Sequence, residues 1–467
     1  MSDPPPFKVL VVGAGIGGLA LGVMLERANM NYEILEKHPY HNPLGSAICL
    51  APSVLPLFKQ LGLDVELKAM SKPFGSLVFR EENMEIIGSY SSRTPVDIKE
   101  RYGEYCQVIA RKDLCALLYN NIPQGKIKFG KRVLDIRQNM GEVIVQCADK
   151  SVHHADILVG ADGAYSAVRQ ALHSDLEAKG LLPKPDLTPL GYQYDCLVGV
   201  TAPLDPHRHS TLFDKFSELQ TVVSKDTTQT HWCIPLTGNR MSWMVVRGHD
   251  KGRKYAEDQI FKQSDWGEDA AEVMSYQYRE LKTPYSCELG YLMDKTPKGF
   301  MAKVMLEEKY YKTWYGGRVV LTGDACHKVV PFGGQGANQA ILDMVALMNL
   351  LVDLNSNTVP EIECIFEKYF KLRSPVGRSS VEVSNRLGGM MNRKGKFNDF
   401  VRRLILRHVP RWFSLMVNDR LSYDRPQLEF LPFVEIEGTL KPKEQTRSTY
   451  VPMVPQDPKI NGPILLH

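Results

Sequence analysis

The chain has 467 residues, of which 43% are hydrophobic and 24% charged, and this suits two domains or one large interleaved unit. A net charge of +4, without a basic-aromatic binding module in the sequence, argues against nucleic acid as a partner. Nine scattered cysteines without a Cys-x-x-Cys pair argue against a disulfide or zinc framework and are typical of reduced thiols in an intracellular protein. The sequence shows no signal-peptide pattern at Met1–Pro6 and no run of about 18 apolar residues, so we expect a cytoplasmic location.

A glycine-rich turn lies near the N-terminus, within a predicted unit of strand, turn, helix and strand at residues 7–12, 13–18, 19–25 and 32–35. Gly13, Gly15 and Gly18 have the spacing that permits a tight turn, close approach of a pyrophosphate and close helix packing. The N-terminus of the helix supplies N–H groups and partial positive charge for the phosphates. Glu36 ends the second strand, and its carboxylate suits a ribose 2′-OH and repels a 2′-phosphate. The motif therefore predicts FAD or NAD and does not distinguish between them.

A second buried strand, at residues 155–161, runs into Asp162 and Gly163. An Asp-Gly pair by itself is usually a turn. Here a strand precedes it, and residues 164–169, which end in Arg169, are a predicted helix start. This context favours a functional site over a simple turn.

The third motif is the most specific of the three. A strand at residues 318–323 leads into Asp324, whose carboxylate suits a sugar-like hydroxyl. The glycine-rich loop at 332–336 follows, and residues 337–351 are a predicted long helix. The N-terminus of such a helix stabilises a ring system that gains negative charge, as a flavin does on reduction.

The three motifs resemble those of the aromatic-hydroxylase type of FAD-dependent monooxygenases, the single-component group A enzymes. Residues 45–52 and 194–200 are similar to the fungal epoxidase and hydroxylase branch of terpenoid and polyketide pathways, and the whole resemblance covers roughly residues 7 to 385. It implies an α/β fold, in which a Rossmann-like FAD-binding domain is interleaved with a β-sheet substrate domain and followed by a C-terminal helical and proline-rich tail. The expected ranges are 1–75, 105–180 and 300–385 for the FAD-binding domain, 76–104 and 181–299 for the substrate domain, and 386–467 for the tail.

The resemblance also implies where FAD is held. It places the adenosine ribose at Glu36, the pyrophosphate at the first glycine turn, the flavin phosphate and ribityl region at Arg111, and the ribityl chain at Asp324. Asp162 and Gly163 would serve both FAD and the passing NAD(P)H. The full set of expected cofactor-binding residues is Gly13, Gly15, Gly18, Glu36, Lys37, Cys49, Arg111, Val133, Asp162, Gly163, Asp324, Pro331, Gly334, Gly336, Ala337 and Asn338.

By the same resemblance, NAD(P)H reduces the flavin, and one oxygen atom of O2 is inserted into a small molecule. Tyr194 and His327 are the candidate catalytic residues, and the alternatives are a buried strand tyrosine and a packed loop histidine. Some relatives bind a phenolate with an arginine where this chain has Asp195, so we expect a more apolar substrate. No metal ligands are expected. A halogenase or reductase on the same fold and a non-catalytic flavoprotein are the alternative functions.

Two further segments have recognisable patterns. Residues 229–235 and 241–247, joined by a Gly-Asn turn, predict a hairpin in the substrate domain. Residues 397–411 have apolar side chains at helical spacing together with arginines. This segment is either a basic amphipathic helix on a membrane surface or a helix packed on the FAD-binding domain. Beyond Pro410, the frequent prolines predict a chain without regular structure.

Overall fold

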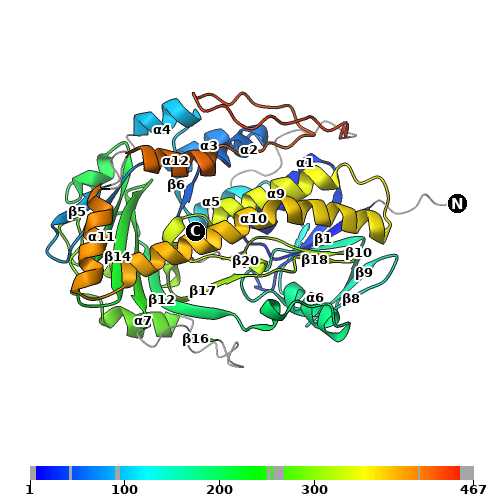
Figure 1. The fold of residues 1–467 in the computed structure, drawn as a ribbon, viewed down its shortest axis with the longest axis horizontal. Helices are drawn as coiled ribbons and strands as arrows, with labels where there is room; N and C mark the ends of the chain where they lie inside the picture. The colour runs from blue at the N-terminus through cyan, green and yellow to red at the C-terminus, as the bar shows by residue number, and fades with distance from the viewer. Residues whose placement is uncertain are drawn as a thin grey trace.

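The structure is a computed structural model that describes residues 7–41, 45–89, 95–249, 254–255, 268–408 and 411–452. Met1–Pro6, where the sequence shows no signal-peptide pattern, lies outside the described residues. Two sheets dominate the chain, one mainly parallel and one large and mixed, and long helices pack beside them (Figure 1).

The parallel sheet has the strand order β18-β19-β11-β1-β2-β7. All neighbours pair in parallel except β18, which is antiparallel to β19. The central strand β1 has the run Val9–Val12 buried, as expected for a strand covered on both faces. The strands are β1 (Lys8–Val12), β2 (Asn31–Leu35), β7 (Ile127–Lys128), β11 (Ile157–Gly160), β18 (Tyr315–Gly316) and β19 (Val319–Leu321). The predicted βαβ unit is confirmed, with α1 (Ile16–Arg27) between β1 and β2.

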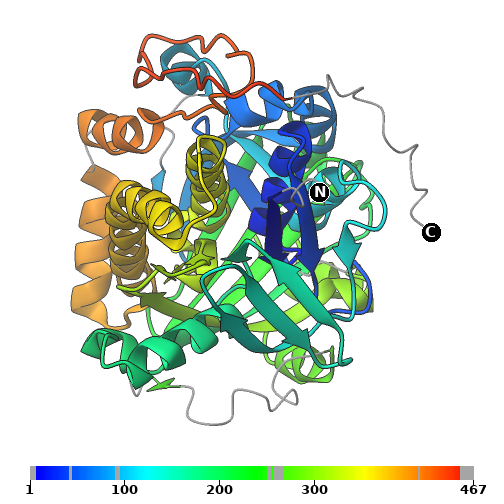
Figure 2. The same ribbon diagram turned by 90° about the vertical axis from the view of Figure 1, so that its right-hand side faces the viewer.

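Helices cover the parallel sheet on one side. Figures 1 and 2 show α1 (dark blue) beside α9 (Gly336–Leu351, yellow) and α10 (Val359–Asn392, dark yellow to orange). On the other side lie α6 (Ala167–Ala178) and a three-stranded antiparallel sheet. That sheet consists of β8 (Val133–Gln138), β9 (Val143–Cys147) and β10 (Val152–Ala155).

The large mixed sheet has the strand order β20-β17-β12-β15-β14-β13-β4-β6-β3, with β5 on β4 and β16 on β12. The predicted hairpin is confirmed: β14 and β15 are antiparallel, and Leu236 pairs with Arg240. The sheet crosses the expected domain limits, because β3, β6, β17 and β20 fall in ranges assigned to the FAD-binding part and β4 crosses one of the limits. Its strands are β3 (Ala47–Leu50), β4 (Lys72–Arg80), β5 (Ile86–Ser89), β6 (Gln107–Ala110), β12 (Gly191–Val200), β13 (Ser217–Val223), β14 (Gln229–Leu236), β15 (Arg240–Gly248), β16 (Lys254–Tyr255), β17 (Met301–Tyr310) and β20 (His327–Lys328).

Shorter helices connect these sheets. The α-helices are α2 (Leu55–Gln60), α3 (Asp64–Met70), α4 (Pro95–Tyr102), α5 (Arg111–Tyr119), α7 (Glu268–Tyr276) and α8 (Leu289–Asp294). The 3₁₀ turns are η1 (Lys184–Leu187), η2 (Ser210–Phe213), η4 (Lys298–Phe300), η5 (Gly323–Ala325) and η6 (Pro331–Gly333). The interleaved α/β architecture expected from the sequence is confirmed, whereas the exact division into domains stays a prediction.

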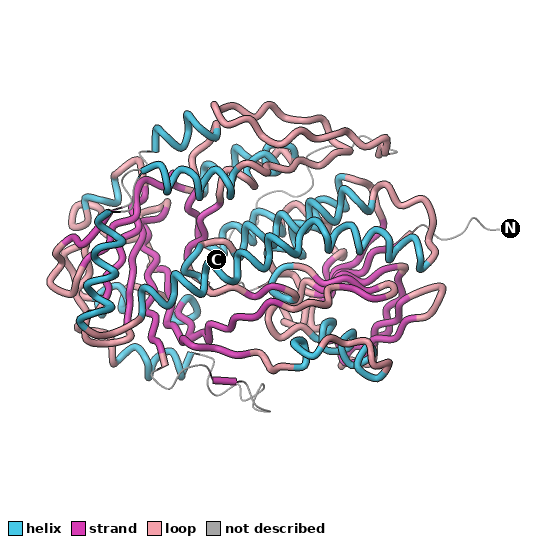
Figure 3. Tube along the Cα trace, in the orientation of Figure 1, coloured by secondary structure: helices cyan, strands magenta, loops and turns pink. Residues whose placement is uncertain are grey.

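The C-terminal part contains one helix that the sequence analysis did not predict. After α11 (Lys396–His408), the chain forms α12 (Arg411–Ser422), so the expectation of no regular structure beyond Pro410 is wrong. The reason is local: no proline lies between Pro410 and Pro426, so the twelve residues of α12 can form helical hydrogen bonds. The rest of the described tail is loop, drawn in pink at the top of Figure 3.

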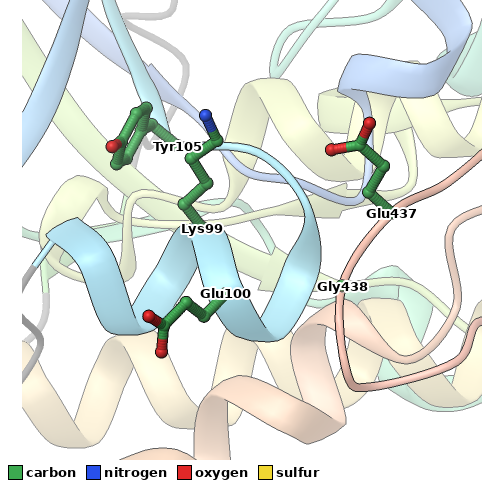
Figure 4. Close-up of a pocket in the computed structure, with 5 residues that line it drawn as sticks. All are labelled: Lys99, Glu100, Tyr105, Glu437 and Gly438. Atoms are coloured by element: carbon green, nitrogen blue, oxygen red, sulfur yellow. The ribbon is translucent and has the colours of Figure 1, made fainter.

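The tail is held against α4 by backbone hydrogen bonds. The N–H groups of Thr439 and Leu440 donate to the carbonyls of Glu100 and Arg101, each over 2.9 Å. The buried Arg425 donates to the carbonyl of Tyr102 over 3.0 Å. Between α4 and the tail is a cavity of about 410 Å³, lined by Lys99, Glu100, Tyr105, Glu437 and Gly438 (Figure 4). Among the described residues, no helix combines the length and the apolar character needed to cross a bilayer.

Candidate functional site

The first glycine turn is closely packed at two positions and open at the third. Gly13 has a φ of +105°, and a Cβ on it would lie 2.5 Å from the carbonyl oxygen of Ala161. A Cβ on Gly18 would lie 1.9 Å from the carbonyl oxygen of Gly13. At Gly15, the N-cap of α1, no described atom lies within 4 Å of an added Cβ. The turn therefore has space in front of the helix N-terminus, where the dinucleotide motif places a pyrophosphate.

The carboxylate of Glu36 lies beside this turn. One oxygen accepts the N–H of Ala14 over 2.8 Å, and the other accepts the N–H of His38 over 2.9 Å. Each oxygen keeps a further lone pair for a ligand hydroxyl. Lys37 is exposed next to it, and Val133 is buried at the start of β8.

The predicted residues Arg111 and Cys49 lie at the edge of the mixed sheet. Arg111 is the first residue of α5, its side chain is exposed, and its N–H donates to the carbonyl of Ser46 over 2.9 Å. A Cβ added to Gly45 would lie 2.6 Å from Cδ of Arg111, so a glycine at this position leaves room for the arginine side chain. Cys49 lies on β3, which pairs with β6 directly before Arg111.

Asp162 has one engaged and one unengaged oxygen. Its Oδ2 accepts the N–H of Ala167 over 2.7 Å at the start of α6. Its Oδ1 is buried and has no hydrogen-bond partner among the described residues. Burial raises the pKa of this carboxyl. At the neighbouring Gly163, no described atom lies within 4 Å of an added Cβ. The unpaired Oδ1 of Asp162 therefore lies next to open space in which a ligand could supply its hydrogen bond.

Arg169 joins the second and third motifs. Its buried guanidinium donates to the carbonyl of Ala325 over 2.9 Å and to the carbonyl of Ala164 over 2.7 Å. The stretch after Asp162 is thereby fixed to the turn that carries Asp324.

Asp324 belongs to a polar cluster that the sequence analysis only partly anticipated. The Lys328 ammonium donates to Oδ2 of Asp324 over 2.7 Å, and the Tyr165 hydroxyl donates to Glu307 over 2.6 Å. Burial alone would lower the pKa of Lys328, but Asp324 and Glu307 raise it overall. Burial raises the pKa of Glu307. The Asp324 side chain is 34% exposed and thus accessible to a ligand.

The glycine-rich loop follows as η6, in which Pro331 is the first residue. Gly334 has a φ of +62°, and no described atom lies within 4 Å of its added Cβ. The Asn338 side chain, buried in the first turn of α9, donates to the carbonyls of Cys49 over 2.9 Å and Gly334 over 3.0 Å. It also accepts the N–H of Ala51 over 2.9 Å. Asn338 therefore ties the loop to β3, and the backbone of Gly336 and Ala337 begins α9 beside this open position.

The two candidate catalytic residues lie in different surroundings. His327 is buried, and its Nε2 lies 2.6 Å from an oxygen of Asp343. The ring of Tyr194 packs edge-on against Phe332 of the loop, with ring centroids 5.3 Å apart. Burial raises the pKa of Tyr194. Neither catalytic role is tested by these contacts, and both stay predictions.

Among the described residues, Cys326, His327 and Asp343 have ligand atoms within 4.8 Å of one another. Arg373 donates to Asp343 over 2.7 Å, so the carboxylate is already neutralised by a guanidinium. The buried ion pair of Asp343 and Arg373 favours a structural role for this carboxylate over a metal centre.

The residues fit FAD. Free space lies at three of the glycine positions predicted to contact it, at Gly15, Gly163 and Gly334, and the unpaired Asp162 oxygen lies at the second of them. The sequence profile of the FAD binding domain family matches residues 6–185 and 217–384. The chain belongs to this family.

Curated relatives are FAD-dependent monooxygenases of fungi. The chain is 30% identical over 444 residues to the FAD-dependent monooxygenase ausM of Aspergillus calidoustus, covering 92% of this chain and 90% of that one. It is 26% identical over 459 residues to ctvC of Aspergillus terreus, covering 96% and 92%. Among solved structures, Klebsiella pneumoniae HpxO with FAD and uric acid has a TM-score of 0.70 at 21% identity, covering 89% and 97%, and shares the fold.

The chain is accordingly an FAD-dependent monooxygenase, as expected from the sequence, and the expected co-substrate NAD(P)H is consistent with this family. The alternatives of a halogenase, a reductase or a non-catalytic flavoprotein are not favoured by these relatives.

Proposed function

We propose that this monooxygenase inserts one oxygen atom of O2 into an apolar small molecule of terpenoid or polyketide type, by epoxidation or hydroxylation. The observation that supports the proposal is a buried apolar cluster where the mixed sheet meets the glycine-rich loop. This apolar cluster consists of Tyr194, Cys196, Val198, Met244, Val246, Ala302, Leu306 and Val330, with Trp232, Val304 and Phe332 packed against it. Apolar side chains beside the expected flavin site favour an apolar substrate.

Asp195 lies on the opposite face of β12 from Tyr194, because successive residues of a strand point to opposite faces. It is buried and accepts a hydrogen bond from Arg247 over 3.0 Å, on the side of Tyr278 rather than on the side of the glycine-rich loop. This pair therefore supplies no cation to a phenolate or carboxylate substrate that packs against Tyr194.

When bound and reduced by NAD(P)H, FAD supplies the electrons that activate O2 for transfer of one oxygen atom. The chain's own residues hold the cofactor and keep water away. Gly13, Gly15 and Glu36 would hold the adenosine side, and Asp324 and the start of α9 the flavin side. The aromatic pair of Tyr194 and Phe332 would cover the site, and Tyr194 would contact the substrate.

The test uses the purified full chain with its flavin. We expect a yellow protein whose NAD(P)H oxidation is accelerated by apolar terpenoid or polyketide compounds, with label from isotopic O2 in the product. Acceleration only by phenolic or carboxylic acids would contradict the proposed substrate class. Absence of label from O2 in the product would contradict oxygen insertion.

We further propose peripheral contact with a membrane through α11 and α12. Two charged residues of α11 face inward: Asp399 and Arg402 are buried, and Arg402 donates a hydrogen bond to Asp399 over 2.7 Å. Most apolar side chains of α11 face outward, with Phe397 77% and Phe400 63% exposed, whereas Leu406 is buried. Leu404, Ile405, Trp412 and Met416 are also exposed. Lys396 and Arg407, both exposed, flank this face. This arrangement supports binding to an anionic bilayer rather than packing on the FAD-binding domain.

Cosedimentation with vesicles tests this contact. We expect binding to phosphatidylcholine–phosphatidylserine vesicles that weakens with added salt and is lost in a Phe397→Ser, Phe400→Ser double variant. Val65 and Met140, each 74% exposed elsewhere, give the matched control when changed to serine. Equal binding by both double variants, or none by the unchanged protein, would contradict the proposal.

A further inference from the structure

One buried carboxylate links the two segments expected to hold the flavin. We propose that Asp343 is a positioning residue that fixes the Asp324 turn and the first turn of α9 relative to each other. The inference rests on the proposed flavin contacts of those two segments. It concerns FAD binding and flavin properties, and it does not depend on which substrate the enzyme oxidises.

The carboxylate of Asp343 is 0% exposed and contacts three other elements. Its Oδ2 accepts the N–H of Gly323 over 2.9 Å, directly before Asp324. The same oxygen lies 2.6 Å from Nε2 of His327 on β20. Its Oδ1 accepts the Nε–H of Arg373 on α10 over 2.7 Å. A single side chain of α9 thus sets the backbone position of the Asp324 turn.

Arg373 extends this network to the N-terminus of α9. Its guanidinium donates to Oε1 of Gln339 over 2.5 Å and to the Gln339 carbonyl over 3.4 Å. The side chain of Gln339 in turn donates to Gln335 over 3.3 Å, at the N-cap of α9. The glycine-rich loop and the Asp324 turn are therefore both held by the Asp343–Arg373 pair.

An ionised Asp343 suits this position. Burial alone would raise its pKa, but His327 and Arg373 lower it overall. Loss of this buried anion is expected to destabilise the fold, because the positive charge of Arg373 would then be buried without a counter-charge. The ring of Trp314 lies 5.1 Å from that of His327 and closes the network on one side.

The anion also has an electrostatic consequence. Reduction adds electrons to a bound flavin, and loss of the Asp343 charge would leave the Arg373 guanidinium as an uncompensated positive charge that favours this. Removal of the Asp343 charge is therefore expected to make the midpoint potential of the flavin more positive. A residue that served only to stabilise the core would not change the potential.

The experiment compares Asp343→Asn with Asp399→Asn in the full-length chain. Asp399 is a matched control, because it is also buried and paired with an arginine, but lies on α11. We expect Asp343→Asn to bind FAD about tenfold more weakly, as for loss of one buried charge-assisted contact. We also expect a more positive flavin midpoint potential and an altered visible circular dichroism of the bound flavin. Asp399→Asn should change none of the three.

Unchanged FAD affinity and potential in a folded Asp343→Asn protein would overturn the proposal, even if that protein were less stable. If Asp343→Asn does not fold, Arg373→Gln provides the test, because it removes the positive charge that Asp343 pairs with. It is expected to weaken FAD binding and to make the flavin potential more negative, and wild-type values of both would overturn the proposal. Failure of the unchanged protein to bind FAD would instead refute the flavin site itself.

Discussion

The ammonium of Lys328 donates a hydrogen bond to the carboxylate of Asp324 over 2.7 Å. Asp324 is the expected ribityl contact, so a lysine shares the carboxylate that is predicted to meet the cofactor. Glu307 adds a second acidic group to the surroundings of this lysine and contributes to its raised pKa. One cation therefore balances two carboxyl groups next to the predicted site of an anionic dinucleotide.

Changing Lys328 to methionine leaves these carboxyl groups without their cation. We expect FAD to dissociate roughly ten times more readily, because a charge-assisted contact contributes about 1.5–3 kcal/mol. Fluorescence titration of the apoprotein with FAD measures this. Lys371→Met is the control, since Lys371 pairs with Glu367 over 2.7 Å on the exposed surface. Equal affinities for the two variants would show that Lys328 has no part in binding.

Two glycines of the first turn should respond differently to substitution. Gly18→Ala places a Cβ 1.9 Å from the Gly13 carbonyl oxygen, and should lower the free energy of unfolding of the apoprotein by about 3 kcal/mol. Gly15→Val fills open space and should leave apoprotein stability nearly unchanged while abolishing FAD binding. Urea denaturation and FAD titration separate the two effects. A Gly15→Val protein that retains FAD would place the pyrophosphate elsewhere.

The stability of the protein should depend on pH through Glu307. Burial raises its pKa above the ordinary value of 4.5, so folding favours the protonated form. Its contribution is complete below pH 4.5 and is lost as the pH rises through the folded-state pKa. Glu307→Gln should therefore gain stability relative to the unchanged protein as the pH increases over that range. Urea titrations at several pH values measure this difference, and parallel curves would contradict it.

Tyr194 offers a test of the apolar cluster beside the glycine-rich loop. Tyr194→Ala removes the ring that packs on Phe332, and kcat/KM for substrate-stimulated NAD(P)H oxidation should fall about threefold to tenfold, since such aromatic pairs contribute about 0.5–1.5 kcal/mol. Tyr194→Phe keeps the ring and should lose less. A Tyr194→Phe loss as large as that of Tyr194→Ala would instead assign the role to the hydroxyl.

The local parts of this fold could be predicted from the sequence. The β1–α1–β2 unit, the β14–β15 hairpin and α9 follow from glycine spacing, alternation of apolar residues and helical periodicity over short stretches. Their boundaries differ from the predicted ones by only a few residues, because turns and caps are local.

The partners within the site could not be predicted in this way. Asp343 pairs with Arg373 from the next helix, and the Tyr165 hydroxyl reaches Glu307 on a strand 142 residues away. Such contacts arise only when distant elements pack, so no periodicity in the sequence indicates them. The sequence did contain one indication of these partners, because Lys328 follows Asp324 by four residues. Whether the two side chains meet depends on the path of the chain through η5, which the spacing alone does not determine.

The bond between Arg425 and the Tyr102 carbonyl joins positions 323 residues apart. On the ribosome, the chain emerges from its N-terminus, so this contact can form only after the 323 residues that follow Tyr102 have been synthesised. A chain that ends before residue 425 still contains β1, β11 and β19 of the parallel sheet. It lacks the hydrogen bond from Arg425 that holds the C-terminal segment against α4.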